Sequence, residues 1–166
     1  MIIGVMSDTH KNMELMNKAA DLMVGTFGVE RIYHLGDDYE DGEALAARGV
    51  KVKTVPGVYD REYAEPGIPR RATDDLQGTK ILAAHAVKTI PQVEISTADI
   101  VLIGHTHLYE ITSVGNAVVF NPGHLKNHSD KGREPTFGII EIGDDGVRIT
   151  VHNLDGEPVE TRELVR

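Results

Sequence analysis

The first half of the chain alternates short apolar runs with amphipathic segments. Residues 1–7 form a nearly continuous apolar run rich in β-branched side chains, which is typical of a strand covered on both faces. Apolar residues then recur at helical spacing over 13–27, before Gly28, and this predicts a helix. Strands over 31–35 and 50–55 and a helix over 41–48 continue the pattern. This β-α-β-α-β order predicts a parallel sheet with right-handed crossovers.

The middle of the chain is less regular. Residues 56–75 hold three prolines and several charges, so we expect a loop there. Two further apolar runs, over 80–84 and 99–103, predict strands. Between them, Pro91 limits residues 89–98 to a short helix or a turn.

After residue 107, short strands are separated by dipeptides that favour tight turns, such as Gly-Asn, Pro-Gly and Asp-Gly. The predicted strands cover residues 111–114, 117–121, 136–142 and 147–154. Hairpin connections join antiparallel neighbours. The expected fold class is therefore α/β, with a parallel-rich N-terminal half and an antiparallel C-terminal half.

Length and composition set the limits for function. The chain has 166 residues and no linker-like stretch, so we expect one domain over residues 1–166. The absence of cysteine excludes disulfides and thiolate ligands, and any metal must be held by nitrogen and oxygen atoms. There is no apolar run of membrane-spanning length and no basic leader segment. We expect a cytoplasmic protein that does not associate with membranes.

The net charge of −9 argues against binding to duplex nucleic acid, which needs clustered positive charge. It does not exclude a phosphate substrate, because bound divalent cations would reverse the local field.

Residues that commonly bind metals stand at or just after the ends of the predicted strands. These residues are Asp8, His10, Asp37, His85, His105 and His107. Ligands at the ends of parallel strands converge on one crevice. Carboxylate and imidazole together suit Mn, Fe or Zn, and two such ions roughly 3.5–4 Å apart can activate a bridging hydroxide. Taken singly, Asp8 could be an ordinary loop residue, and His34, inside a strand, is better explained as a hydrogen-bonded core histidine.

The ordered set Asp8-x-His10, Gly36-Asp37, His85 and Gly104-His105-Thr106-His107 resembles the calcineurin-like metallophosphoesterases. Within that family, the small bacterial and archaeal phosphodiesterase branch is the most similar in length and in its late Asn-Pro-Gly turn. The resemblance covers essentially the whole chain. It implies a four-layer α/β/β/α sandwich with a dinuclear site at one end.

The resemblance also implies a role for each ligand. Asp8, His10 and His107 would hold the first ion, His85 and His105 the second, and Asp37 would bridge the two. One or two divalent ions are expected per chain, Mn first, with Fe, Zn, Ni or Mg as alternatives. Asp37 and His105 are expected to be essential for catalysis, in which a metal-bound hydroxide attacks a small phosphate ester.

One departure from the family pattern concerns the second ion. The family uses an asparagine in a Gly-Asn-x-Asp or Gly-Asn-His-Glu motif, but this chain reads Gly57-Val58-Tyr59-Asp60. Valine cannot be a ligand. Water, Asp60, Asp38 or His124 could compensate, and the sequence does not choose among them.

Two residues near these motifs are candidates for binding substrate. Tyr59 either packs in the core or places a phenol near the phosphate. His124 stands where the family usually has serine after the Asn-Pro-Gly turn.

Two hypotheses for function follow. The first is a metal-dependent phosphoesterase, more specifically a phosphodiesterase, with a one- or two-metal site. The alternative, motivated by Val58, is a catalytically weak or inactive member that serves as a metal-stabilised binding or scaffold module. The family includes a non-catalytic case in the retromer subunit. A nuclease has little support from the charge. The substrate, the native metal, the acid that protonates the leaving group and any homo-oligomer are left open.

Overall fold

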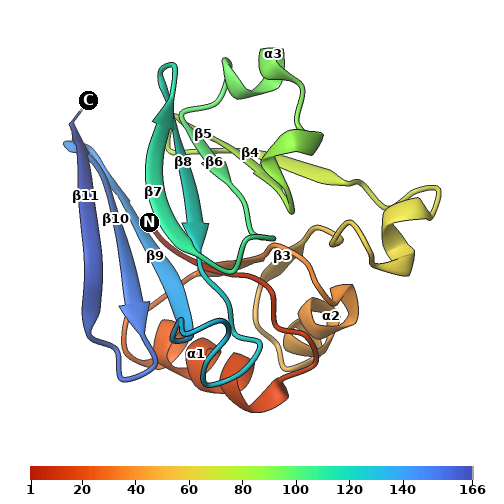
Figure 1. Ribbon diagram of the computed structural model, residues 1–166. Helices are drawn as coiled ribbons and strands as arrows, with labels where there is room; N and C mark the ends of the chain where they lie inside the picture. The colour runs from red at the N-terminus through yellow and green to blue at the C-terminus, as the bar shows by residue number, and fades with distance from the viewer. Residues whose placement is uncertain (166) are drawn as a thin grey trace.

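A computed structural model of the protein describes residues 1–165. Two mixed β-sheets pack face to face, and helices cover their outer faces (Figure 1). The layers therefore run helix, sheet, sheet, helix. This arrangement confirms the predicted α/β sandwich.

The first sheet is built around β1 (Ile2–Met6), which pairs in parallel with β2 (Arg31–His34) and antiparallel with β9 (Thr136–Gly143). Its strand order is β11-β10-β9-β1-β2-β3. The other strands are β3 (Val52–Thr54), β10 (Gly146–Asn153) and β11 (Pro158–Val165). The predicted parallel β1-β2-β3 arrangement is confirmed.

The second sheet has the order β4-β5-β6-β8-β7. At its centre, β6 (Ile100–Leu102) is parallel to both β5 (Thr79–Ala84) and β8 (Ala117–Pro122). The edge strands β4 (Arg71–Leu76) and β7 (Tyr109–Val114) are antiparallel to their neighbours. Thus β8 combines an antiparallel hairpin with β7 and a parallel pairing with β6.

Helices α1 (Met13–Gly25) and α2 (Tyr39–Ala47) lie against the first sheet, and α3 (Gln92–Ile95) lies beside the second (Figure 1). Asn12 caps α1, as its side-chain oxygen accepts a hydrogen bond from the amide of Leu15. Two short 3₁₀ turns complete the helical elements, η1 (Arg61–Ala64) and η2 (Val87–Thr89). Within residues 1–165, no helix is long and apolar enough to cross a membrane.

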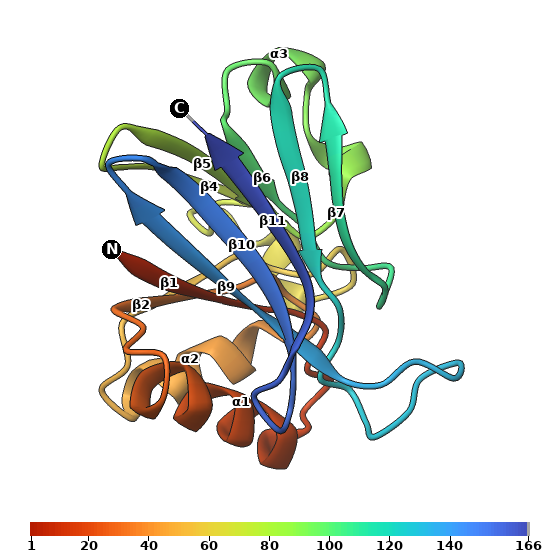
Figure 2. The same cartoon turned by 90° about the vertical axis from the view of Figure 1, so that its left-hand side faces the viewer.

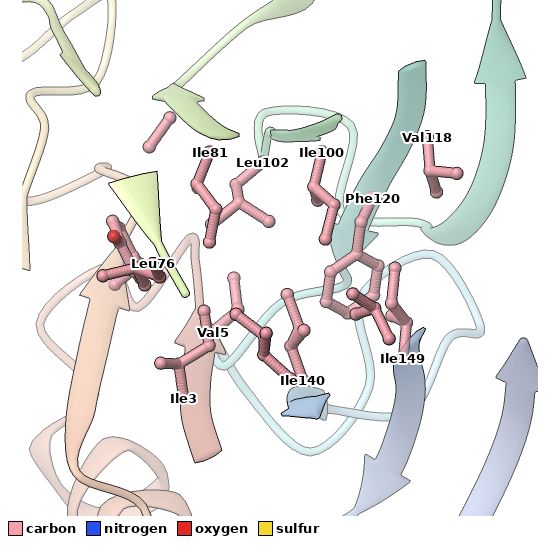
Figure 3. Close-up of a cluster of buried hydrophobic side chains, with 14 of the residues drawn as sticks. Ile3, Val5, Leu76, Ile81, Ile100, Leu102, Val118, Phe120, Ile140 and Ile149 are labelled. Carbon is pink, nitrogen blue, oxygen red and sulfur yellow. The ribbon is translucent and has the colours of Figure 1, made fainter. Parts of the chain in front are cut away.

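The main hydrophobic core fills the space between the sheets (Figure 3). Its side chains alternate with others that face the helices, as the two-residue period of a strand requires. Gly138 is part of this packing, because an added Cβ would lie only 2.3 Å from Cζ of Phe120. The first sheet contributes Ile3, Val5, Ile140 and Ile149, and the second contributes Ile81, Ile100, Leu102 and Phe120.

Two strands differ from the sequence prediction. Residues 56–75 are not a continuous loop, since η1 and the start of β4 lie within them. β4 carries Asp74, which accepts a hydrogen bond from Lys53 on the other sheet. A pattern of hydrophobic residues does not reveal a strand that is held by polar contacts of this kind. β11 was not predicted, because most of its side chains are exposed.

A buried polar network supports the loops after β1 and β2. The hydroxyl of Thr9 donates to Oδ2 of Asp41 over 2.6 Å, so it must accept from Nε2 of His34, 3.0 Å away. His34 is 0% exposed and its Nδ1 has no hydrogen-bond partner in the described part of the chain. Burial lowers the pKa of His34 to about 4. His34 is thus the hydrogen-bonded core histidine that its strand position predicts.

This burial predicts a loss of stability in acid. In the unfolded chain His34 takes up a proton near pH 6.5, but in the folded protein only near pH 4. As the pH falls through this window the unfolded state binds more protons, so the His34 contribution should lower the free energy of unfolding by about 3 kcal/mol. Urea unfolding of chelator-treated protein measures this. His34→Gln keeps an N–H group that can donate to Thr9 but does not titrate, so its free energy of unfolding should change less with pH. An equal pH dependence in the wild type and the variant would contradict the prediction.

Candidate metal centre

The loops that follow β1, β2, β5 and β6 bring all the predicted metal ligands to one place. The side chains form two groups, and within each group the donor atoms all lie within 4.8 Å of one another. The first ligand group is Asp8, His10, Asp37 and His107, and the second ligand group is Asp37, His85 and His105. Asp37 belongs to both, as expected of a bridging carboxylate.

Electron-rich atoms face one another at the centre of both groups. In the first, Nε2 of His107 lies 3.3 Å from Nε2 of His10 and 3.3 Å from Oδ1 of Asp8. In the second, Nε2 of His85 lies 3.3 Å from Oδ1 of Asp37 and 3.1 Å from Nδ1 of His105. Such atoms repel unless a proton or cation lies between them. Oδ1 of Asp37 is also buried without a hydrogen bond from any described residue, and this donor set fits divalent cations.

Neighbouring acceptors orient two of the histidines. Nδ1 of His85 lies 2.6 Å from the carbonyl oxygen of Leu35, and Nδ1 of His107 lies 2.8 Å from Oδ2 of Asp130. Each acceptor requires a proton on Nδ1, which leaves Nε2 of a neutral ring with a free lone pair. Histidine ligands of metals are commonly arranged in this way.

The backbone of the ligand loops is unusual. The left-handed region is costly for residues other than glycine, at roughly 1–3 kcal/mol each, and such residues cluster at functional sites. The loops are tied together by bonds from the amide of Asp8 to the carbonyl of Gly36 and from the amide of His105 to the Asp8 carboxylate, both 3.0 Å. Positive φ angles occur at Asp8 (54°), His10 (47°), Asp37 (44°), His105 (73°) and His107 (59°).

Two glycines let these loops approach closely. An added Cβ at Gly104 would lie 1.8 Å from the Ser7 hydroxyl oxygen, and one at Gly57 would lie 2.1 Å from Oδ1 of Asp37. Neither space admits a larger side chain. The glycines that precede His105 and Val58 are therefore part of the site.

The groups also shift one another's protonation. Burial acts to raise the pKa of Asp8, but the hydrogen bond with His107 and the field of His85 outweigh it and the pKa is lowered. The hydrogen bond to Asp8 and, with a smaller effect, the hydrogen bond to Asp130 raise the pKa of His107, although burial acts to lower it. Burial, with the field of His85, lowers the pKa of His105. A cation in the first group would displace any proton held by His107.

Among the described residues, neither Asp60 nor Asp38 takes the place of the missing asparagine in the second ligand group. Asp60 lies nearby, but its Oδ2 accepts a hydrogen bond from the Gly57 amide over 2.7 Å, and burial, together with Asp37 and Asp38, raises its pKa. Asp38 pairs with Lys11, 3.7 Å away. Neither carboxylate belongs to the cluster of donor atoms around His85 and His105.

Tyr59 and His124 occupy opposite environments. Tyr59 is 87% exposed, and its ring centre lies 6.5 Å from that of His105, so the interpretation of Tyr59 as a core residue is wrong. His124 is 0% exposed and lies behind His107, with ring centres 5.6 Å apart. Its burial leaves no surface for a substrate.

Asp130 was missed by the sequence analysis. It lies in an irregular segment between β8 and β9 and belongs to no motif. Its contact with His107 crosses 23 residues of sequence, so no local signal could have revealed it.

Comparisons with known proteins agree with this geometry. A model of the calcineurin-like phosphoesterase superfamily domain matches residues 1–145. The chain is 25% identical to a conserved protein from Streptococcus pneumoniae TIGR4, a predicted phosphoesterase, with a TM-score of 0.74 over 99% of this chain and 97% of that one.

Two more distant structures share the fold. An archaeal phosphodiesterase is 23% identical, with full coverage of both chains and a TM-score of 0.71. Wild-type Vps29 from Entamoeba histolytica, in complex with zinc, is 21% identical over 99% of both chains, with a TM-score of 0.68. Among curated proteins, none matches the chain. Together, the family match and the ligand geometry show that this chain belongs to the calcineurin-like phosphoesterase superfamily.

Proposed function

We propose that the protein is a metal-dependent phosphodiesterase. The observation that carries this proposal is the sharing of Asp37 between two ligand groups, since a bridging carboxylate is what a two-metal hydrolytic site requires. The likeness to an archaeal phosphodiesterase supports it. Bound divalent ions would supply activation of water and would offset the charge on a phosphoryl group.

Residues of the chain would hold and orient these ions. Asp8, His10 and His107 would hold the first ion, His85 and His105 the second, and Asp37 both. Mn²⁺ is our first candidate, and the zinc complex of Vps29 makes Zn²⁺ the second. The Leu35 carbonyl keeps Nε2 of His85 free, so the ligand needs no reorientation when a cation enters.

Tyr59 is proposed to bind the organic part of the substrate. Its ring stands exposed beside His105, and its hydroxyl forms no hydrogen bond with the described residues. An exposed aromatic ring favours a flat, apolar group. This favours an aryl or nucleoside ester over a purely aliphatic one. His124, being buried, is proposed only to pack against His107.

The alternative function is a metal-stabilised scaffold with little activity. It is favoured by one observation: Val58 takes the place of an expected ligand, and the second ligand group has only three residues. The two functions differ in how many ions the protein binds and in whether it turns over a substrate.

The first prediction concerns Asp37. Protein stripped with chelator and titrated with Mn²⁺ should bind two ions and hydrolyse bis-p-nitrophenyl phosphate. Because removal of a residue that only supports a ligand commonly costs 10–100-fold, Asp37→Asn, which weakens a shared ligand, should lower kcat/KM by at least about 100-fold. Asp144→Asn, in the turn between β9 and β10, is the matched control. Binding of one ion without turnover would support the scaffold instead.

A second prediction concerns the missing ligand. Val58→Asn restores the amide that the family uses for the second ion and should raise the affinity for that ion, with activity at subsaturating Mn²⁺ rising about tenfold, or roughly 1.4 kcal/mol. Val58→Leu has a similar size without a ligand and controls for packing. If both variants behave like the wild type, the valine does not limit the site.

A third prediction separates the ring of Tyr59 from its hydroxyl. Tyr59→Ala should raise the inhibition constant of phenylphosphonate, measured against bis-p-nitrophenyl phosphate, about fivefold, because stacking contributes about 1 kcal/mol. It should leave the inhibition constant of methylphosphonate nearly unchanged. Tyr59→Phe should retain the preference for the phenyl compound. Equal changes for both inhibitors in Tyr59→Ala would exclude stacking.

A further inference from the structure

The segment between β8 and β9 folds back onto the metal centre. Figure 2 shows it as an extension between the end of β8 and the start of β9. Asp130 and Arg133 close a two-residue turn, since the amide of each donates to the carbonyl of the other over 3.0 Å. Lys131 and Gly132 between them have φ angles of 52° and 77°, as expected of a type I′ turn. The turn therefore holds the backbone of Asp130 in one conformation.

This turn is attached to the loop that carries His107. Nη1 of Arg133 donates to the carbonyl of Thr106 over 2.8 Å. On the other side, the side-chain amide of Asn12 donates to the carbonyl of Lys126 over 2.9 Å. The segment thus bridges the first turn of α1 and the ligand loop after β6.

The side chain of Asp130 points at a metal ligand. Asp130 is only 8% exposed, and its Oδ2 lies 2.8 Å from Nδ1 of His107. Its other oxygen lies 3.7 Å from Nζ of Lys126. A carboxylate acceptor holds an imidazole more strongly than a neutral one does.

The two ligand groups differ in this support. His107, in the first group, is held by a carboxylate, whereas His85, in the second, is held by the neutral carbonyl of Leu35. The first group also has four residues and the second has three. Both differences favour tighter binding in the first group.

We propose that Asp130 is a positioning residue for the first ion: it fixes His107 with the proton on Nδ1 and the Nε2 lone pair directed at Asp8, His10 and Asp37. The turn from Asp130 to Arg133 places this carboxylate beside His107. The result is two unequal sites, in which the first ion binds tightly and the second exchanges. This inference rests on the proposed metal centre.

Mn²⁺ titration by calorimetry tests the inference. Asp130→Asn keeps the size of the side chain but loses the charge, and the dissociation constant of the first ion should rise about 10–100-fold, while that of the second stays within about twofold. Asp130→Glu should recover part of the affinity. Asp155→Asn, an exposed aspartate of the turn between β10 and β11, is the matched control and should bind as the wild type does.

The outcomes separate this inference from the proposed function. If the wild type binds no Mn²⁺, the metal centre fails and the inference fails with it. If the wild type binds two ions and Asp130→Asn binds them equally well, the inference is overturned and the phosphodiesterase proposal stands. If Asp130→Asn weakens the binding of both ions to the same extent and lowers the melting temperature of the metal-free protein, Asp130 has a merely structural role. That outcome would also overturn the inference.

A second measurement needs no variant. In long-range ¹H–¹⁵N NMR spectra of the metal-free protein at alkaline pH, the neutral ring of His107 should carry its proton on Nδ1. A ring protonated on Nε2 would overturn the inference even if the Asp130 variants do not fold.

Discussion

The metal centre depends on the packing of two sheets, because its ligands repel one another unless a proton or a cation lies between them. Carboxylate and imidazole atoms of both groups face each other at 3.1–3.6 Å, and five of the ligands have left-handed backbone. Neither feature is stable in an isolated loop. The apolar core between the sheets anchors the strands that carry these loops, so the free energy of core packing offsets the cost of preforming the site.

The two ligand groups differ in a way that bears on both an enzyme and a scaffold. The first group is complete, and a carboxylate supports one of its histidines. The second shares Asp37 but has Val58 where a further ligand is expected. A protein of this kind can retain one ion for stability and still depend on a second, weaker ion for chemistry. The concentration of available metal would then decide how much of it is active.

The central strands and the convergence of the candidate ligands are predictable from the sequence for one reason. Strands such as β1 and β6 are buried on both faces, so they appear as apolar runs, and their carboxyl ends mark where ligands converge. β4 and β11 lack this signal because they are edge strands with polar side chains. The pairing of β8 with β6 and the contact of Asp130 with His107 both join distant residues. Local patterns do not contain such information.

The pairing of β1 with β9 has a consequence for how the protein is made. Asp8 and His10 are synthesised long before residues 136–143, and β1 acquires its second neighbour only when those residues have been added. Long-range pairings of this kind form late in folding. A growing chain therefore exposes several metal-binding side chains without a finished site to hold an ion. Selection of the correct metal is left to a chain in which β1 and β9 have already paired.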